Sequence, residues 1–156
     1  MTDTNLTDEH VLVSARGGLG RITLNRSRAL NALSLDMILT ITRALNEWRD
    51  DTDVETVVID SADPRGLCAG GDVRALREAI IAGKLTEAAE FFRAEYVMND
   101  LIAEYSKPIV AIADGITMGG GIGIAGHASH RIVTETSKLA MPETRIGFTP
   151  DEEVGR

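Results

Sequence analysis

Two glycine-rich turns contain the residues of this sequence whose spacing best suits chemistry. Glycines 119–121 follow the apolar segment 109–113, and glycines 70–71 lie just before an expected helix that begins near Asp72. Because glycine has no side chain, the backbone N–H groups of such turns can approach a ligand closely. Two turns directed at one carbonyl oxygen could stabilise the negative charge that develops during acyl transfer.

Two acidic residues, Glu143 and Asp151, each follow a proline. A carboxylate pair placed by proline-stiffened loops could divide the roles of nucleophile, base and positioning group. Alternatively, Glu143 is a first-turn acid of a short helix and Asp151 is a turn residue. Taken alone, the residues favour this second interpretation. Together with the two glycine turns, they favour the catalytic one.

Two other chemistries fit the sequence less well. Residues 121–126 match the G-x-G-x-x-G pattern of dinucleotide-binding proteins, but the next expected strand begins near Arg131, which leaves too short a helix. Cys68 and His127 could form a nucleophilic pair, although a lone cysteine between apolar neighbours is more often a packed side chain. The three histidines show no metal-ligand spacing, so we expect no metal site.

Composition restricts the class of protein. A chain of 156 residues with 44% hydrophobic residues can bury one core, and the net charge of −8 argues against nucleic-acid or membrane partners. Its single cysteine excludes an intrachain disulfide, as is common in the cytoplasm. We expect no secretory leader, because residues 1–8 are polar and acidic, and no apolar run reaches membrane-spanning length. We therefore predict a soluble, cytoplasmic protein.

Strands and helices are expected to alternate along the chain. Strands 10–15 and 21–24 form a predicted hairpin, and Ser34 is the predicted cap of a helix that runs to about residue 50. Further strands are expected over 56–60, 109–113, 131–134 and 138–140, and further helices over 72–82 and 86–105, with a short one after glycines 119–121. This alternation indicates an α/β fold. We predict a single domain over residues 1–156 that is truncated at its C-terminus, because the sequence ends just after a loop.

Four segments, taken together and in this order, resemble the crotonase (enoyl-CoA hydratase/isomerase) superfamily. They are residues 25–33, 67–73, 116–123 and 141–143. The resemblance implies a spiral of ββα turns with two roughly perpendicular sheets and a C-terminal helical part, which we expect to be missing here. It also implies that the chain acts on acyl-CoA thioesters.

The resemblance assigns roles to particular residues. The backbone N–H groups of Gly71 and Gly120 correspond to the oxyanion hole of the superfamily. Coenzyme A enters only as part of the substrate, with no other cofactor, and a homo-oligomer is possible in this superfamily. The coenzyme A surface corresponds to Arg26, Ala29, Ala69, Asp72 and Val73.

Within the superfamily, two carboxylate positions decide the reaction. Hydratases carry one glutamate where this sequence has Gly123, so water addition by paired glutamates is not expected. Segments 91–96, 115–121 and 143–151 instead resemble the 3-hydroxyisobutyryl-CoA hydrolase branch. There Glu143 would be the nucleophile or general base, and Asp151 would hold the substrate hydroxyl or assist hydrolysis.

Three functions therefore stay open. The leading prediction is hydrolysis of an acyl-CoA thioester, either directly or through a mixed anhydride. The second is hydration or isomerisation of an enoyl-CoA by Glu143 alone. The third is a coenzyme A binder, or a truncated chain, without catalytic activity.

Overall fold

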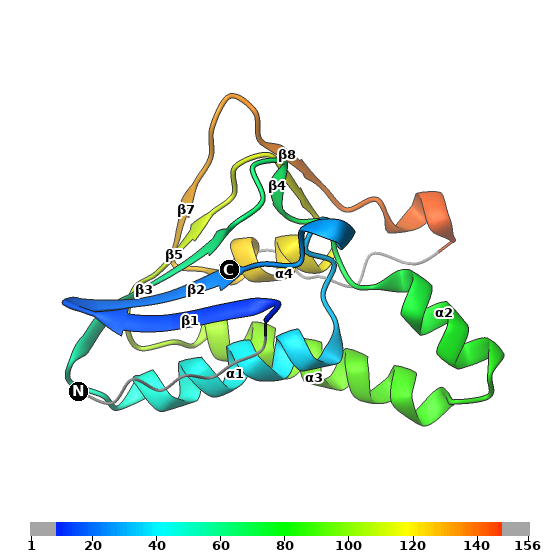
Figure 1. Ribbon diagram of the computed structural model, residues 1–156, viewed down its shortest axis with the longest axis horizontal. Helices are drawn as coiled ribbons and strands as arrows, with labels where there is room; N and C mark the ends of the chain where they lie inside the picture. Colours follow the sequence, from blue (N-terminus) through cyan, green and yellow to red (C-terminus); the bar gives the residue numbers. More distant parts are fainter. Residues whose placement is uncertain (1–8, 148–156) are drawn as a thin grey trace.

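The structure is a computed structural model that describes residues 9–147. Its strands form two sheets (Figure 1). The larger sheet has the order β1 (Val11–Arg16), β2 (Gly18–Leu24), β3 (Val54–Ser61), β5 (Ile109–Ile112) and β7 (His130–Ile132). The smaller sheet has the order β4 (Gly66–Cys68), β6 (Ile116–Met118) and β8 (Lys138–Ala140). Only β1 and β2 are antiparallel; all other pairs in the described chain are parallel.

From β3 onward the chain repeats one pattern three times. Each repeat adds a strand to the larger sheet, then a strand to the smaller sheet, and then forms helix. The helices after these strand pairs are α2 (Val73–Ile81) with α3 (Leu85–Ala103), α4 (Gly120–His127) and the 3-10 helix η2 (Glu143–Ile146). This is the ββα spiral that the resemblance implies, so the expected fold class is confirmed.

The spiral brings three distant segments together. Strands β4, β6 and β8 are parallel neighbours, so their carboxyl ends lie at the same edge of the smaller sheet. The segments that leave those ends are 69–72, 119–120 and 141–143. These segments contain both glycine turns and Glu143.

Helix α1 (Leu35–Arg49) covers the core beside α3 (Figure 1). It begins as expected at Ser34, whose hydroxyl accepts a hydrogen bond from the N–H of Met37. Its buried face includes Ile38, Ile41 and Leu45, which follow the helical spacing seen in the sequence.

Most expected elements are confirmed to within a few residues, but two strands were missed. The sequence analysis expected no strand over 66–68 or 116–118, whereas β4 and β6 lie there. Each has only three residues, but so have β7 and β8, which were predicted, so length alone does not explain the difference. Their pairing depends on one another and on β8, which lies far along the chain.

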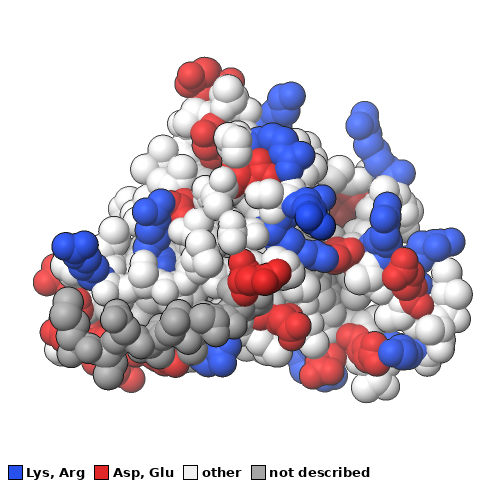
Figure 2. Space-filling view, viewed as in Figure 1, with Lys and Arg blue, Asp and Glu red and all other residues white. Residues whose placement is uncertain are grey.

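The surface shown in Figure 2 carries acidic and basic side chains interspersed rather than in separate fields. Within residues 9–147, none of the helices combines the length and the apolar character that crossing a membrane requires. In the same range, no three histidine, cysteine or acidic side chains lie together as metal ligands would.

Candidate active site at the edge of the smaller sheet

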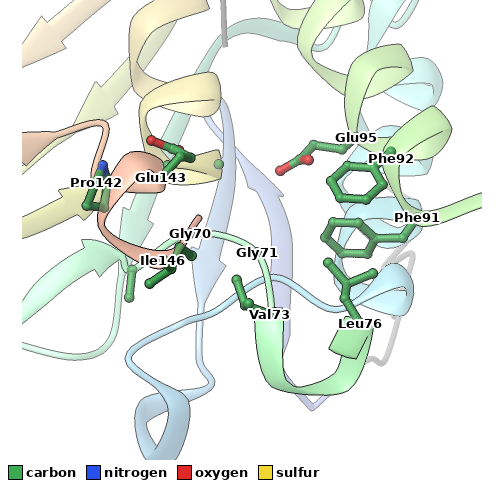
Figure 3. A pocket seen from close by; sticks show the side chains of 13 residues that line it. Gly70, Gly71, Val73, Leu76, Phe91, Phe92, Glu95, Pro142, Glu143 and Ile146 are labelled. Carbon is green, nitrogen blue, oxygen red and sulfur yellow. The ribbon is translucent and has the colours of Figure 1, made fainter. Parts of the chain in front are cut away.

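A pocket of about 90 Å³ lies where the three strands of the smaller sheet end. Its backbone wall comes from residues 69–71, 119–120 and 142–143. Its apolar wall comes from α2, α3 and η2, through Val73, Leu76, Phe91, Phe92 and Ile146 (Figure 3). Backbone amides and apolar side chains thus face the same space.

The first glycine turn is held by a segment from far upstream. The N–H of Leu33 donates to the carbonyl of Gly70 over 2.8 Å, and the N–H of Asp72 donates to the carbonyl of Leu33 over 2.9 Å. Because the C=O and N–H of a trans peptide point in opposite directions, the first bond directs the Gly71 N–H away from Leu33. The Gly71 nitrogen lies 3.5 Å from the point that a Cβ on Gly120 would occupy.

The second glycine turn is held by the helix that follows it. Gly119 has a φ of 51°, and its carbonyl accepts from the N–H groups of Ile122 and Gly123 over 2.8 and 3.2 Å. The Gly120 N–H therefore projects from the amino end of α4, where the helix carries partial positive charge. Gly71 and Gly120, whose amides are the predicted oxyanion donors, thus lie close together and both line one pocket.

Glu143 lies across the pocket from Glu95 (Figure 3). Its Oε1 is 3.1 Å from the point that a Cβ on Gly119 would occupy, and its Oε2 is buried with no hydrogen-bond partner in the described structure. A carboxylate oxygen that accepts no hydrogen bond can take a proton or attack a carbonyl. Glu143 is also the first residue of the 3-10 helix η2, so the position in a first turn that the alternative interpretation gave it coexists with its place in the pocket. Asp151 lies outside the described residues.

Glu95 is a pocket residue that the sequence analysis did not single out. It is 4% exposed and projects from α3 into the pocket (Figure 3). A signal was present: residues 88, 91, 95, 98 and 102 follow helical spacing and are buried, and Glu95 alone among them is charged. A carboxylate on the apolar stripe of a helix suggests a polar task inside the core.

The five residues predicted for the coenzyme A surface fall into three places. Ala69 and Val73 line the pocket, whereas Ala29 lies in a separate open groove together with Arg26. Arg26 also pairs with Asp72 across 2.9 Å between Nη1 and Oδ2. Burial alone raises the pKa of Asp72, but the hydrogen bond from the Ala75 N–H and the pairing with Arg26 outweigh it and lower the pKa.

Comparison with known proteins identifies the family. A family model described as enoyl-CoA hydratase/isomerase matches residues 19–155. The chain belongs to the enoyl-CoA hydratase/isomerase family. The resemblance seen in the sequence is thereby confirmed.

Individual members of this family are similar over most of the chain. The mitochondrial 3-hydroxyisobutyryl-CoA hydrolase of Rattus norvegicus is 50% identical over 90% of this chain, and that of Homo sapiens is 46% identical over 92%. The chain spans only 36% and 37% of the lengths of these two relatives. Since both relatives are named mitochondrial, the cytoplasmic location stays a prediction.

Solved structures agree with the fold. The crystal structure of a carnitinyl-CoA dehydratase from Mycobacterium thermoresistibile matches with a TM-score of 0.89 and 47% identity, covering 92% of this chain and 42% of that one. An enoyl-CoA hydratase from Rhodobacter sphaeroides matches with a TM-score of 0.88 and 50% identity, covering 91% and 42%.

Proposed function

We propose that this chain hydrolyses short acyl-CoA thioesters of the 3-hydroxyisobutyryl type. The observation that carries the proposal is the meeting of Gly71, Gly120 and Glu143 around one pocket. Two backbone amides side by side suit an oxygen that gains negative charge, and the carboxylate opposite suits activation of the attacking group. The names of the two mitochondrial relatives support the same reaction.

The proposed step begins with the thioester oxygen between the N–H groups of Gly71 and Gly120. Glu143 either takes a proton from water as the water attacks the carbonyl carbon, or attacks that carbon itself. The carbon–sulfur bond then breaks, and the sulfur leaves as the thiol of coenzyme A after taking a proton. In the second route, water hydrolyses the resulting mixed anhydride and restores the Glu143 carboxylate.

Isotopically labelled water detects the anhydride route when water attacks the glutamyl carbonyl, whereas attack at the substrate carbonyl labels the acid product as general-base hydrolysis does. In a single turnover, water that attacks the anhydride at the glutamyl carbonyl leaves its oxygen in the side chain of Glu143. General-base hydrolysis leaves the label in the acid product alone. Peptide mass analysis of the enzyme after turnover reads out the difference.

The size and lining of the pocket support a small acyl group. A cavity needs roughly 10–15 Å³ to hold one water, so about 90 Å³ corresponds to a few waters or to a short acyl chain. Phe91 and Leu76 give it an apolar wall, while Glu95 offers a carboxylate to a polar substituent. A branched acyl group with one hydroxyl matches this combination.

Enoyl-CoA hydration is the second candidate. The solved relatives named above as a hydratase and a dehydratase favour it, and Glu95 supplies the pocket with a second carboxylate that the sequence analysis did not consider. Gly123, however, has no side chain to act at the position that hydratases use. Loss of enoyl absorbance from crotonyl-CoA, measured beside thiol release from 3-hydroxyisobutyryl-CoA, separates the two reactions.

Replacement of Glu143 tests the proposal. We expect Glu143→Gln to lower kcat for thiol release by about 10²–10⁴-fold, the usual contribution of a positioned base. The matched control is Glu135→Gln, an exposed glutamate between β7 and β8, which should keep the activity of the unaltered chain. Full hydrolysis by Glu143→Gln contradicts the assignment. Calorimetric binding of coenzyme A without any turnover by the unaltered chain favours the non-catalytic binder.

A further inference from the structure

An ion pair joins two segments that the resemblance assigns to coenzyme A. Arg26 Nη1 and Asp72 Oδ2 are 2.9 Å apart, and their side chains are only 24% and 18% exposed. An ion pair shielded in this way is screened less by salt than one on the open surface. The side chains of Arg26 and Asp72 therefore hold one another in place.

Asp72 is the residue directly after the Gly71 amide. Its Oδ1 accepts from the N–H of Ala75 and so caps α2, while its own N–H donates to the carbonyl of Leu33. A displacement of Asp72 therefore moves Gly71, the residue that carries the predicted oxyanion N–H. The carboxylate of Asp72 holds one end of the first glycine turn.

Arg26 also forms hydrogen bonds with the upstream segment that leads into Leu33. Its Nη1 also donates to the carbonyl of Ala32 over 2.8 Å, and its backbone N–H donates to Oδ1 of Asn31 over 2.7 Å. Leu30 and Asn31 both have positive φ values, 50° and 57°. Asparagine adopts this region readily, but a leucine there is rare and is held by surrounding contacts.

Arg26 thus contacts both of the backbone segments that determine the direction of the Gly71 N–H. One contact is with residue 32, next to Leu33, whose N–H holds the Gly70 carbonyl; the other is with Asp72. We propose that the Arg26–Asp72 ion pair is a positioning device for the Gly71 amide, rather than a contact with coenzyme A. This inference rests on the proposed function, because it holds that the ion pair raises the rate of thioester hydrolysis by positioning the Gly71 amide.

A double-mutant cycle tests the pair. The variants are Arg26→Met, Asp72→Asn and the double variant; asparagine keeps the cap of α2 and removes only the charge. A misplacement of about 1 Å at a reacting group can lower a rate 10²-fold, so partial loosening should lower kcat about tenfold in each single variant. We expect KM and the calorimetric Kd for coenzyme A to change less than about twofold, and the double variant to match the singles.

A second ion pair provides the control. Arg21 and Asp60 are 2.6 Å apart between β2 and β3, and neither lines the pocket. Arg21→Met should therefore leave kcat and KM unchanged. The inference is overturned if Arg26→Met raises KM and the Kd for coenzyme A while kcat stays constant, or if the two single losses add in the double variant.

Hydrogen exchange gives a measurement that needs no turnover. In Arg26→Met, the amides of Leu33 and Asp72, which form the bonds beside Gly71, should exchange about tenfold faster. The Val57 amide, which donates to the carbonyl of Pro108, should not change. Unchanged exchange at Leu33 and Asp72 refutes the positioning role. If the unaltered chain shows no turnover, the proposed function fails and this measurement still decides the inference.

Discussion

The two glycine turns place their amides in the same pocket by different means. The Gly120 amide is oriented by α4, because the helix that begins there engages the preceding carbonyl. The Gly71 amide is oriented by Leu33, a residue nearly forty positions upstream, with Arg26 and Asp72 beside it. One donor is therefore a local product of its own sequence, and the other is a product of the whole fold.

This difference also separates the tasks of the three consecutive glycines. Gly119 adopts the left-handed backbone of the turn, and Gly120 offers its N–H to the pocket. Gly121 faces elsewhere: a Cβ there would be 2.5 Å from the carbonyl oxygen of Cys68 at the end of β4. It permits close packing of α4 on the strand that leads into the first turn, so the turns are coupled through backbone contact.

The largest effect is expected from Gly121→Ala. Its Cβ would meet backbone, which cannot turn aside, so we expect the free energy of unfolding to fall by about 3 kcal/mol, the upper end for overpacking. Gly71→Ala is the matched variant, because its Cβ would meet only the ring of Phe91 at 3.1 Å. That ring can shift, so we expect a loss of about 1 kcal/mol. Urea titration measures both, and equal losses would contradict the distinction between the turns.

A smaller effect on the free energy of unfolding is expected from Asn31→Ala, which removes hydrogen bonds from the upstream segment that holds the first glycine turn. Asn31 is fully buried, and its amide accepts from the Arg26 N–H and donates to the carbonyl of Leu67 over 2.9 Å. Removal leaves buried groups without partners, so we expect a loss of about 2 kcal/mol in the free energy of unfolding.

Asn25→Ala is the control for that variant. The amide of Asn25 makes an exposed hydrogen bond to the carbonyl of Glu9, and its loss should change stability by less than about 1 kcal/mol. A similarly small change in Asn31→Ala would mean that the upstream segment does not hold the first turn.

The same comparison explains what could be predicted from the sequence. The Gly120 turn, the caps and the long helices depend on neighbours within a few residues, and their patterns predicted them. The strands β4 and β6 and the bond from Leu33 to Gly70 depend on partners far along the chain, which no local pattern shows. The family resemblance assigned Arg26 and Asp72 to the coenzyme A surface, and that assignment stays a prediction; their pairing with one another depends on the fold and was not predicted.

The smallest predicted effect is a pH dependence of the free energy of unfolding, which arises in the loop before β4. Asp63, whose side chain is 3% exposed, accepts hydrogen bonds from the side chain and backbone N–H of Arg65, and these lower its pKa from 3.8 to about 2. Because the folded pKa lies below the unfolded one, the stabilisation is complete above about pH 4 and is lost as the pH falls through about 2. Asp63→Asn lacks this titration. The difference in denaturation midpoint between the two proteins should therefore be constant from pH 7 to 4 and shrink below that. A difference that shrinks already between pH 7 and 5 would show that Arg65 does not hold the carboxylate, and that this approach to the first turn is looser than its hydrogen bonds indicate.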